Sequence, residues 1–136
     1  MYEIFEHTAD LGLRVGGATL PELLAEAARG LFAMVVEDLG SVRPLVTREF
    51  HVTGSDRTYL LFDWLNELLF VCDTERLAFS QFEVRVTAAG LAATARGETL
   101  DPARHHPTHE IKAITYHGLT VEESKEGWLA EVIVDI

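Results

Sequence analysis

The sequence contains one cysteine and no long run of apolar residues. Cys72 alone cannot form an intrachain disulfide, which is typical of proteins that work in the reducing cytosol. No stretch of about 18 apolar residues occurs, so we expect no membrane-spanning helix. The first residues also lack the basic segment followed by an apolar one that marks a signal peptide. These absences predict a cytoplasmic protein that does not enter a membrane.

Basic residues are scarce. The chain has 11 lysines and arginines against 22 aspartates and glutamates, which gives a formal net charge of −11. Proteins that bind nucleic acid directly usually carry a basic patch that displaces counterions from the phosphates, so we expect no direct nucleic-acid binding. The charge suits a protein partner with a basic groove, because opposite fields speed encounter. The alternative is that the acidity only keeps a small protein soluble.

The common catalytic motifs are also missing. There is no G-x-x-x-x-G-K-[ST] loop, no G-x-S-x-G elbow and no H-E-x-x-H helix. His105, His106 and His109 lie close together in the sequence, but their spacing matches no structural zinc pattern and no cysteine accompanies them. We interpret them as belonging to a solvated histidine-rich loop, formed by the longest irregular stretch, 97–108, and the residue that follows it.

Hydrophobic periodicity predicts the fold. Apolar residues recur every three or four positions over 20–35 and 60–72, and Thr19 with Glu22 forms a capping box before the first of these helices. Cys72 continues the second apolar stripe, so we interpret it as a core residue. Alternating patterns predict strands at 2–5, 11–15, 46–53, 79–86, 91–95, 111–121 and 128–136. The order predicts an α+β fold in one compact domain, 1–136, with two amphipathic helices packed on largely antiparallel β-sheets.

Polar residues gather where the first predicted strand ends. His7, Thr8 and Asp10 follow the apolar run 2–5, and Gly12 is the residue expected to permit a turn there. Loops held by rigid elements often carry function. The alternative is that Thr8 and Asp10 only bond to the backbone of their own turn.

The last predicted strand ends on a second isolated carboxylate, Asp135. If this strand lies beside the first, Asp135 comes near Asp10, and a cation would relieve the repulsion between the two carboxylates. Carboxylate and carbonyl oxygens suit Ca²⁺, Mg²⁺ or Mn²⁺, and the carbonyl and free carboxylate of Ile136 would be further donors. The alternative is that Asp135 is simply exposed at a strand end.

Lys112 lies inside an otherwise apolar run. The simplest arrangement has its ammonium group reaching out to water while the stem lies on apolar surface. Alternatively it pairs with a carboxylate, or it holds an anion such as a phosphate.

Four segments, in this order, resemble the archease family. They are HTADLG at 7–12, LLFDWLNELL at 60–69, EIKAITYH at 110–117 and WLAEVIVDI at 128–136. Together they span nearly the whole chain, whereas 18–38 matches only in general character and 98–108 carries no family motif. Each segment alone is modest, but four in the family's order are specific.

The resemblance implies a non-catalytic accessory protein of an RtcB-type tRNA-splicing ligase. That ligase joins RNA ends with GTP and Mn²⁺ through a guanylylated histidine of its own, and an archease promotes guanylylation and repeated turnover. The resemblance also implies a metal site, often assigned as calcium, with Mn²⁺ and Mg²⁺ as alternatives. Its ligands carry over to Asp10, Asp135 and the backbone of Ile136, while His7 and Lys112 fall in family motifs as supporting residues.

Two other classes of function compete with this interpretation. One is a stand-alone metal-dependent phosphoesterase built on the same two aspartates, which the sequence disfavours because only His7 lies near them as a general base. The other is a general chaperone-like interaction protein. It would expose large apolar patches, whereas both helical stripes are expected to face the core.

Overall fold

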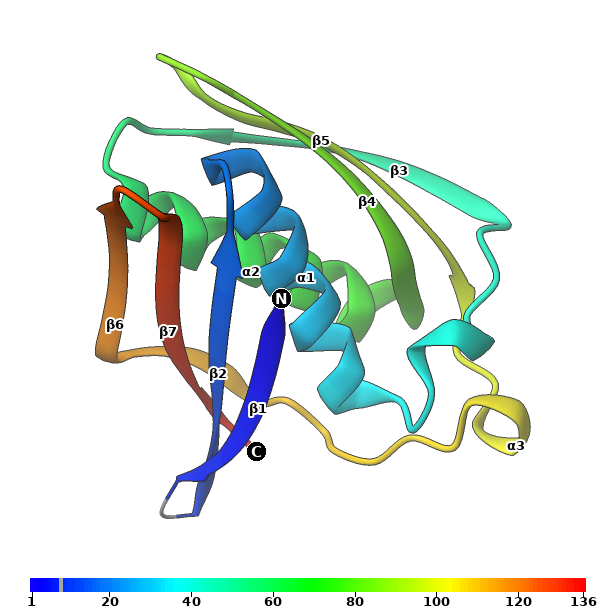
Figure 1. Ribbon diagram of the computed structural model, residues 1–136. Coiled ribbons are helices and arrows are strands. Elements are labelled where there is room, and N and C mark those ends of the chain that lie inside the picture. Colours follow the sequence, from blue (N-terminus) through cyan, green and yellow to red (C-terminus); the bar gives the residue numbers. More distant parts are fainter. Residues whose placement is uncertain (8) are drawn as a thin grey trace.

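In the computed structural model two antiparallel sheets lie on either side of the two long helices (Figure 1). It describes residues 1–7 and 9–136, without the side chain of His7. The elements are β1 (Tyr2–His7), β2 (Asp10–Gly17), α1 (Leu20–Val35), a 3-10 turn η1 (Leu39–Ser41), β3 (Val46–Thr53), α2 (Arg57–Glu75), β4 (Leu77–Thr87), β5 (Gly90–Thr99), α3 (Pro102–His105), β6 (Ala113–Ser124) and β7 (Gly127–Asp135). The first sheet has the order β1-β2-β7-β6 and the second the order β3-β5-β4.

Helix α1 lies between the sheets and contacts β2 of the first and β4 of the second. Its start is the predicted capping box: the Thr19 hydroxyl accepts a hydrogen bond from the N–H of Glu22 at 3.3 Å. The Glu22 carboxylate accepts from the N–H of Ala18 at 3.0 Å, one residue before the cap. The apolar stripe of α1 is buried, so the prediction of a core-facing helix is confirmed.

Helix α2 contacts β6 of the first sheet and β3 of the second. Asp56 caps it by accepting from the N–H of Tyr59 at 3.1 Å. The indole N–H of the fully buried Trp64 donates to the carbonyl of Leu24 at 2.9 Å, which ties α2 to α1. Cys72 is buried as predicted, and burial raises the pKa of its thiol to about 11. The thiol is therefore a protonated core group at neutral pH.

In the described part of the chain, none of the helices combines the length and apolar character needed to cross a membrane.

The hairpin of β1 and β2 differs from expectation at its turn. Gly12 lies inside β2, paired with Phe5, and the turn comes earlier, where Ala9 has a left-handed φ of 61°. Gly12 is needed for packing, because a Cβ there would overlap the Phe5 ring. The prediction that Gly12 makes the turn is therefore wrong. Thr8, which was predicted to take part in the turn, lies outside the described residues.

Strand β6 begins later than predicted and is irregular. It starts at Ala113, and its register with β7 shifts between Thr115 and Thr120, where Gly118 has a φ of 67°. Tyr116 leaves the regular ladder here and stacks on Phe62 of α2, with ring centroids 3.8 Å apart. An aromatic contact with α2 therefore replaces strand pairing at this point.

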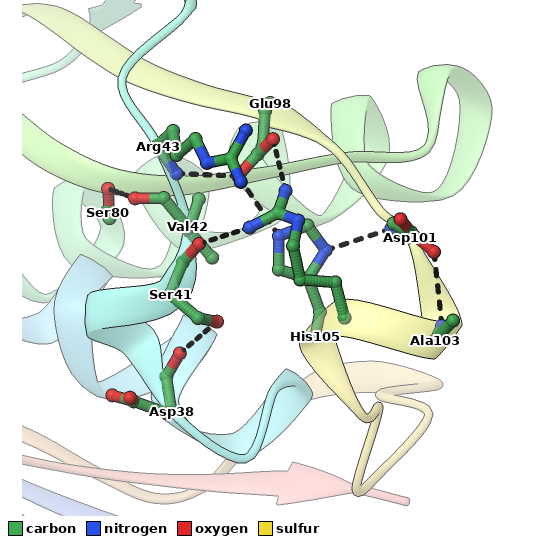
Figure 2. Close-up of polar contacts among 10 residues, drawn as sticks. Asp38, Ser41, Val42, Arg43, Ser80, Glu98, Asp101, Ala103 and His105 are labelled. Atoms are coloured by element: carbon green, nitrogen blue, oxygen red, sulfur yellow. Dashed lines mark hydrogen bonds and ion pairs between the residues drawn. The ribbon is translucent and has the colours of Figure 1, made fainter.

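The stretch expected to be irregular contains the end of β5, the short helix α3 and a buried ionic cluster (Figure 2). Glu98 is only 7% exposed. Its carboxylate forms an ion pair with Arg104 and accepts from the N–H of Arg43 at 2.7 Å. The Arg104 guanidinium lowers the pKa of Glu98 to about 2, helped by the Arg43 N–H and by His105. Buried charge is tolerated here because every side of the carboxylate has a donor.

His105 belongs to this cluster and corrects the prediction of a solvated histidine loop. It is completely buried, whereas His106 and His109 are exposed. Its Nδ1 accepts the N–H of Asp101 at 2.8 Å, so the proton sits on Nε2, which faces Glu98 at 3.1 Å. The sequence pattern missed this because Glu98, the partner of His105, lies in a different element.

The segment after α3 is fastened to the end of α1. The Thr108 N–H donates to the carbonyl of Val35 at 3.0 Å, and its hydroxyl donates to the carbonyl of Met34 at 2.7 Å. These bonds satisfy carbonyls that the helix end leaves open. Together with the Glu98 cluster they fix the path that leads the chain to Lys112 and β6.

We predict that Glu98→Gln lowers the free energy of unfolding by about 1.5–3 kcal/mol, the range for hydrogen bonds to a charged group. The variant leaves the guanidinium of Arg104 without its anion. Urea unfolding followed by circular dichroism measures the change. Glu83→Gln is the matched control, because Glu83 forms an exposed pair with Arg96 at 3.3 Å, which is worth about 0–1 kcal/mol. Equal losses in the two variants would contradict a stabilising role of the cluster.

The same carboxylate predicts a pH dependence. Its pKa is about 2 in the folded protein, below the ordinary value of 4.5. Its contribution to stability is therefore complete above about pH 4.5 and is lost as the pH falls towards 2. We expect the difference in unfolding free energy between wild type and Glu98→Gln to shrink from pH 5.5 to pH 3, about the range in which only the unfolded state takes up the proton. A difference that stays constant would show that Glu98 keeps an ordinary pKa.

Candidate functional site

The two predicted aspartates lie directly opposite each other in the first sheet. Asp10 is the first residue of β2, Asp135 is the last residue of β7, and the two are register partners. The predicted proximity is therefore present, although β7 pairs with the second strand and β1 lies at the sheet edge. Asp10 was expected in a loop after the first strand and instead opens β2 (Figure 1).

Both carboxylates project from the outer face of the sheet. Leu11 and Val134, their neighbours in sequence, are buried against the helices. Successive side chains of a strand point to opposite faces, so Asp10 and Asp135 share the face turned away from the core. Both are half-buried. Opposed residues in antiparallel strands have Cβ atoms about 4.5–5.5 Å apart, a separation at which two carboxylates repel and at which one cation can be shared.

Asp10 and Asp135 belong to a row of register partners that crosses the sheet, and this row has one further member on each side of the pair. His7, the last residue of β1, is the register partner of Asp10, and Ala113, the first residue of β6, is the partner of Asp135. The side chain of His7 lies outside the described part of the structure. On the β6 side only the methyl group of Ala113 adjoins Asp135, so no bulky side chain of the row covers that carboxylate.

Lys112 lies beside this row, one residue before the start of β6. Its backbone N–H donates to the carbonyl of Asp135 at 2.8 Å, which fixes its position. Its side chain is exposed, as the simplest interpretation of the sequence expected. No salt bridge of Lys112 occurs among the described residues. The structure therefore places the backbone of Lys112 beside Asp135 and leaves the lysine side chain exposed.

Ile136 follows Asp135 directly. It is half-buried, and its side chain packs against the core. That packing holds the backbone beside Asp135, where a carbonyl oxygen could contribute to a cation site. Among the side chains that the structure describes, which do not include that of His7, no group of three or more His, Cys, Asp or Glu is gathered to hold a metal ion. The acidic side chains described at this row are thus the pair Asp10 and Asp135.

Sequence reasoning missed the residues that support this face. Arg14 of β2 bonds Glu3 at 3.5 Å and Glu131 at 3.3 Å, and its guanidinium lies 5.0 Å from the centre of the Phe5 ring. These contacts join β1, β2 and β7 a few residues away from the aspartates. The alternation of Leu13, Arg14 and Val15 in the sequence could have placed Arg14 on this outer face, but not its partners.

Comparisons with known proteins give one family. The sequence pattern of the Archease protein family (MTH1598/TM1083) matches residues 2–136. The chain is 42% identical to "Protein archease" of Pyrococcus abyssi, covering 99% of this chain and 98% of the relative. It is 40% identical to "Protein archease" of Methanopyrus kandleri, covering 99% of each chain.

Solved structures agree with the sequence relatives. The solution structure of Methanobacterium thermoautotrophicum protein 1598 superposes with a TM-score of 0.87 at 35% identity, covering 99% of this chain and 98% of the other. A Thermotoga maritima crystal structure, described as an archease and possible chaperone, has the same fold, with a TM-score of 0.68 at 23% identity, and covers 100% of this chain and 98% of that one. The chain therefore belongs to the archease family.

Proposed function

We propose that this protein is a non-catalytic accessory protein of an RtcB-type RNA ligase in tRNA splicing and RNA repair in the cytoplasm. In this proposal it promotes guanylylation of the ligase with GTP and allows the ligase to turn over repeatedly. The observation that carries the proposal is the register pair of Asp10 and Asp135 with Lys112 beside it. Membership of the archease family supports it, because the family resemblance is what implies the ligase as partner.

The donor set at the pair fits a hard divalent cation. Two carboxylates supply anionic oxygens, and the backbone at Ile136 can add a neutral one. Ca²⁺ and Mn²⁺ accept such oxygens, and Mg²⁺ usually keeps several waters beside one or two carboxylates. The two side chains leave further coordination positions for water or for groups of a partner. We propose calcium as the ion, with Mn²⁺ or Mg²⁺ as alternatives.

A divalent cation at this site would supply positive charge to the phosphates of a bound nucleotide. The chain's own residues then have separate tasks. Asp10 and Asp135 hold the cation at the rim of the sheet, and their strands keep the carboxylates from moving apart. Lys112 offers three N–H donors and a charge that can contact a phosphate oxygen. His7 adjoins Asp10 in the same row and is proposed as a supporting residue.

The overall charge favours a protein partner over RNA. A net charge of −11 repels a free phosphate backbone but attracts a basic active-site groove. The aspartate pair would enter such a groove as a ready-made anionic site with Lys112 at its edge. The reacting histidine in this proposal belongs to the ligase, so the accessory chain needs no nucleophile of its own.

We expect millimolar CaCl₂ to raise the melting temperature of the wild-type protein, because an ion that binds only the folded state stabilises it. At ten times the Kd the gain is about 1.4 kcal/mol. Asp10→Asn with Asp135→Asn should abolish the shift while keeping the melting temperature in EDTA, since the variant also removes the carboxylate repulsion. Glu126→Gln, at the exposed β6–β7 turn, is the matched control. An undiminished shift in the double variant would place the ion elsewhere.

We expect Asp10→Ala, Asp135→Ala and Lys112→Ala each to reduce stimulation of multiple-turnover RNA ligation at least about tenfold, as for other groups that act around a metal. The assay contains the ligase, GTP and Mn²⁺, and Glu126→Ala is the control. Single-turnover ligation by ligase that is already guanylylated should not change, because the proposed step comes before it. Folded variants that stimulate as well as the wild type would refute the proposal, as would phosphoester hydrolysis by this chain alone.

A further inference from the structure

A groove of about 710 Å³ lies between α2 and β3, a strand of the second sheet. One wall is the end of β3, with His51, Val52 and Thr53, and the other is the outer side of α2. The helix wall consists of Asp63, Asn66, Glu67, Leu69, Phe70 and Asp73. The candidate site at Asp10 and Asp135 belongs to the other sheet, so the groove is a separate surface.

Strand β3 offers an open backbone edge to this groove. Within the part of the chain that the structure describes, β3 pairs with β5 alone and is the outermost strand of its sheet. Thr53 is the register partner of Gly90, and the next residue, Gly54, donates its N–H to the carbonyl of Ala89 at 3.0 Å. By the alternation of antiparallel ladders, the backbone groups of Val52 point to β5 and those of His51 and Thr53 point to the open edge.

No neighbour in the described chain uses this edge. Among residues 1–7 and 9–136, no backbone hydrogen bond from outside the sheet reaches His51 or Thr53. Open edges of this kind are templates for another extended chain, because the unpaired N–H and C=O groups already have strand spacing. Peptide-binding domains use this arrangement, in which the peptide adds a strand and side-chain pockets decide its sequence.

The helix wall is acidic with an apolar centre. Asp63, Glu67 and Asp73 are exposed, and none forms a salt bridge within the described residues. Phe70 lies among them and is 63% exposed, which is unusual for so large an apolar side chain. Among the described residues that line the groove there is no lysine or arginine. Burial, and then the nearby carboxylate of Glu110, raise the pKa of Asp73, and the positive charge of Arg76 offsets this only in part.

We propose that the groove binds an extended segment of a partner protein rich in lysine or arginine, which adds a fourth strand to the second sheet along β3. The backbone of the segment pairs with His51 and Thr53. Its basic side chains reach the carboxylates of the helix wall, while their aliphatic stems lie over the Phe70 ring. This binding does not depend on the proposed ligase function.

The negative charge of the groove favours a basic segment over a second copy of this chain. A second copy of this chain would bring the same three carboxylates and a net charge of −11 against the groove, so strand pairing between copies is opposed by repulsion. A basic segment gains from the same field. The two walls are also held in place, because Val52 of β3 and Leu69 of α2 are buried in the same core. Arg48 of β3 adds an exposed ion pair with Glu75 of α2 at 3.0 Å. A groove fixed in advance reduces the ordering that binding requires.

The experiment uses the whole chain and a synthetic probe, a fluorescent capped heptapeptide of alternating lysine and valine. Fluorescence anisotropy measures its affinity, and amide hydrogen exchange by NMR reports on individual backbone groups. We expect saturable binding and slower exchange of the His51 and Thr53 amides. Two N-methylated versions, with methyl groups on alternate residues in either register, keep the charge but remove pairing donors. At least one should bind about tenfold or more weakly, a loss of 1.4 kcal/mol.

Variants locate the contact. Glu67→Lys and Phe70→Ser replace exposed groove residues and should weaken binding without unfolding the protein. Glu126→Lys makes the same charge change at the β6–β7 turn, which does not line the groove, and should weaken binding far less. If Glu67→Lys and Glu126→Lys weakened binding equally, the peptide would respond only to the net charge of the protein, and the proposal would be overturned. Full affinity of both N-methylated peptides would overturn strand addition. So would a dimer in sedimentation experiments that the heptapeptide dissociates, because the occupant would then be a second copy.

Discussion

The register between β2 and β7 is the constraint on which the candidate site depends. It places Asp10 opposite Asp135 only because Leu11 pairs with Val134 and Leu13 with Val132, and all four of these apolar side chains are buried. A slip of one residue would turn them outward and carry the carboxylates to the other face. The hydrophobic core therefore determines the geometry of a polar site that lies outside it.

The position of Lys112 depends on a second, longer-range constraint. The chain reaches Lys112 through a segment that the Glu98 cluster and Thr108 fasten to the rest of the protein, and the Lys112 N–H then bonds the Asp135 carbonyl. A buried carboxylate is costly unless each of its partners is present. Glu98 thus favours a single path for this segment, and with it a single place for the backbone of Lys112 beside Asp135.

The elements of the fold could be predicted from sequence because their periodicity is local. The stripes of α1 and α2 and the Thr19 cap are confirmed, and the proximity of Asp10 to Asp135 followed from strand ends and family resemblance. Gly12 and His105 were misjudged for the same physical reason. Gly12 is required by the Phe5 ring and His105 is buried against Glu98, and each partner belongs to a different element, so the periodicity of one element does not reveal the contact. Strand order depends on pairing between segments much farther apart in the sequence, so the open edge of β3 was not foreseen.

The acidity of the chain acquires a more specific meaning from this arrangement. At physiological ionic strength charges are screened over about 8 Å, so groups on opposite sheets act on a docked partner nearly independently. General attraction of basic surfaces follows from the net charge of −11, but it cannot choose between the two surfaces. Selection of a partner by one surface or the other must therefore come from the groups that lie beside the carboxylates of that surface. At Asp10 and Asp135 this is a rigid pair of oxygens suited to a cation, and along β3 it is a row of backbone donors and acceptors suited to an extended chain.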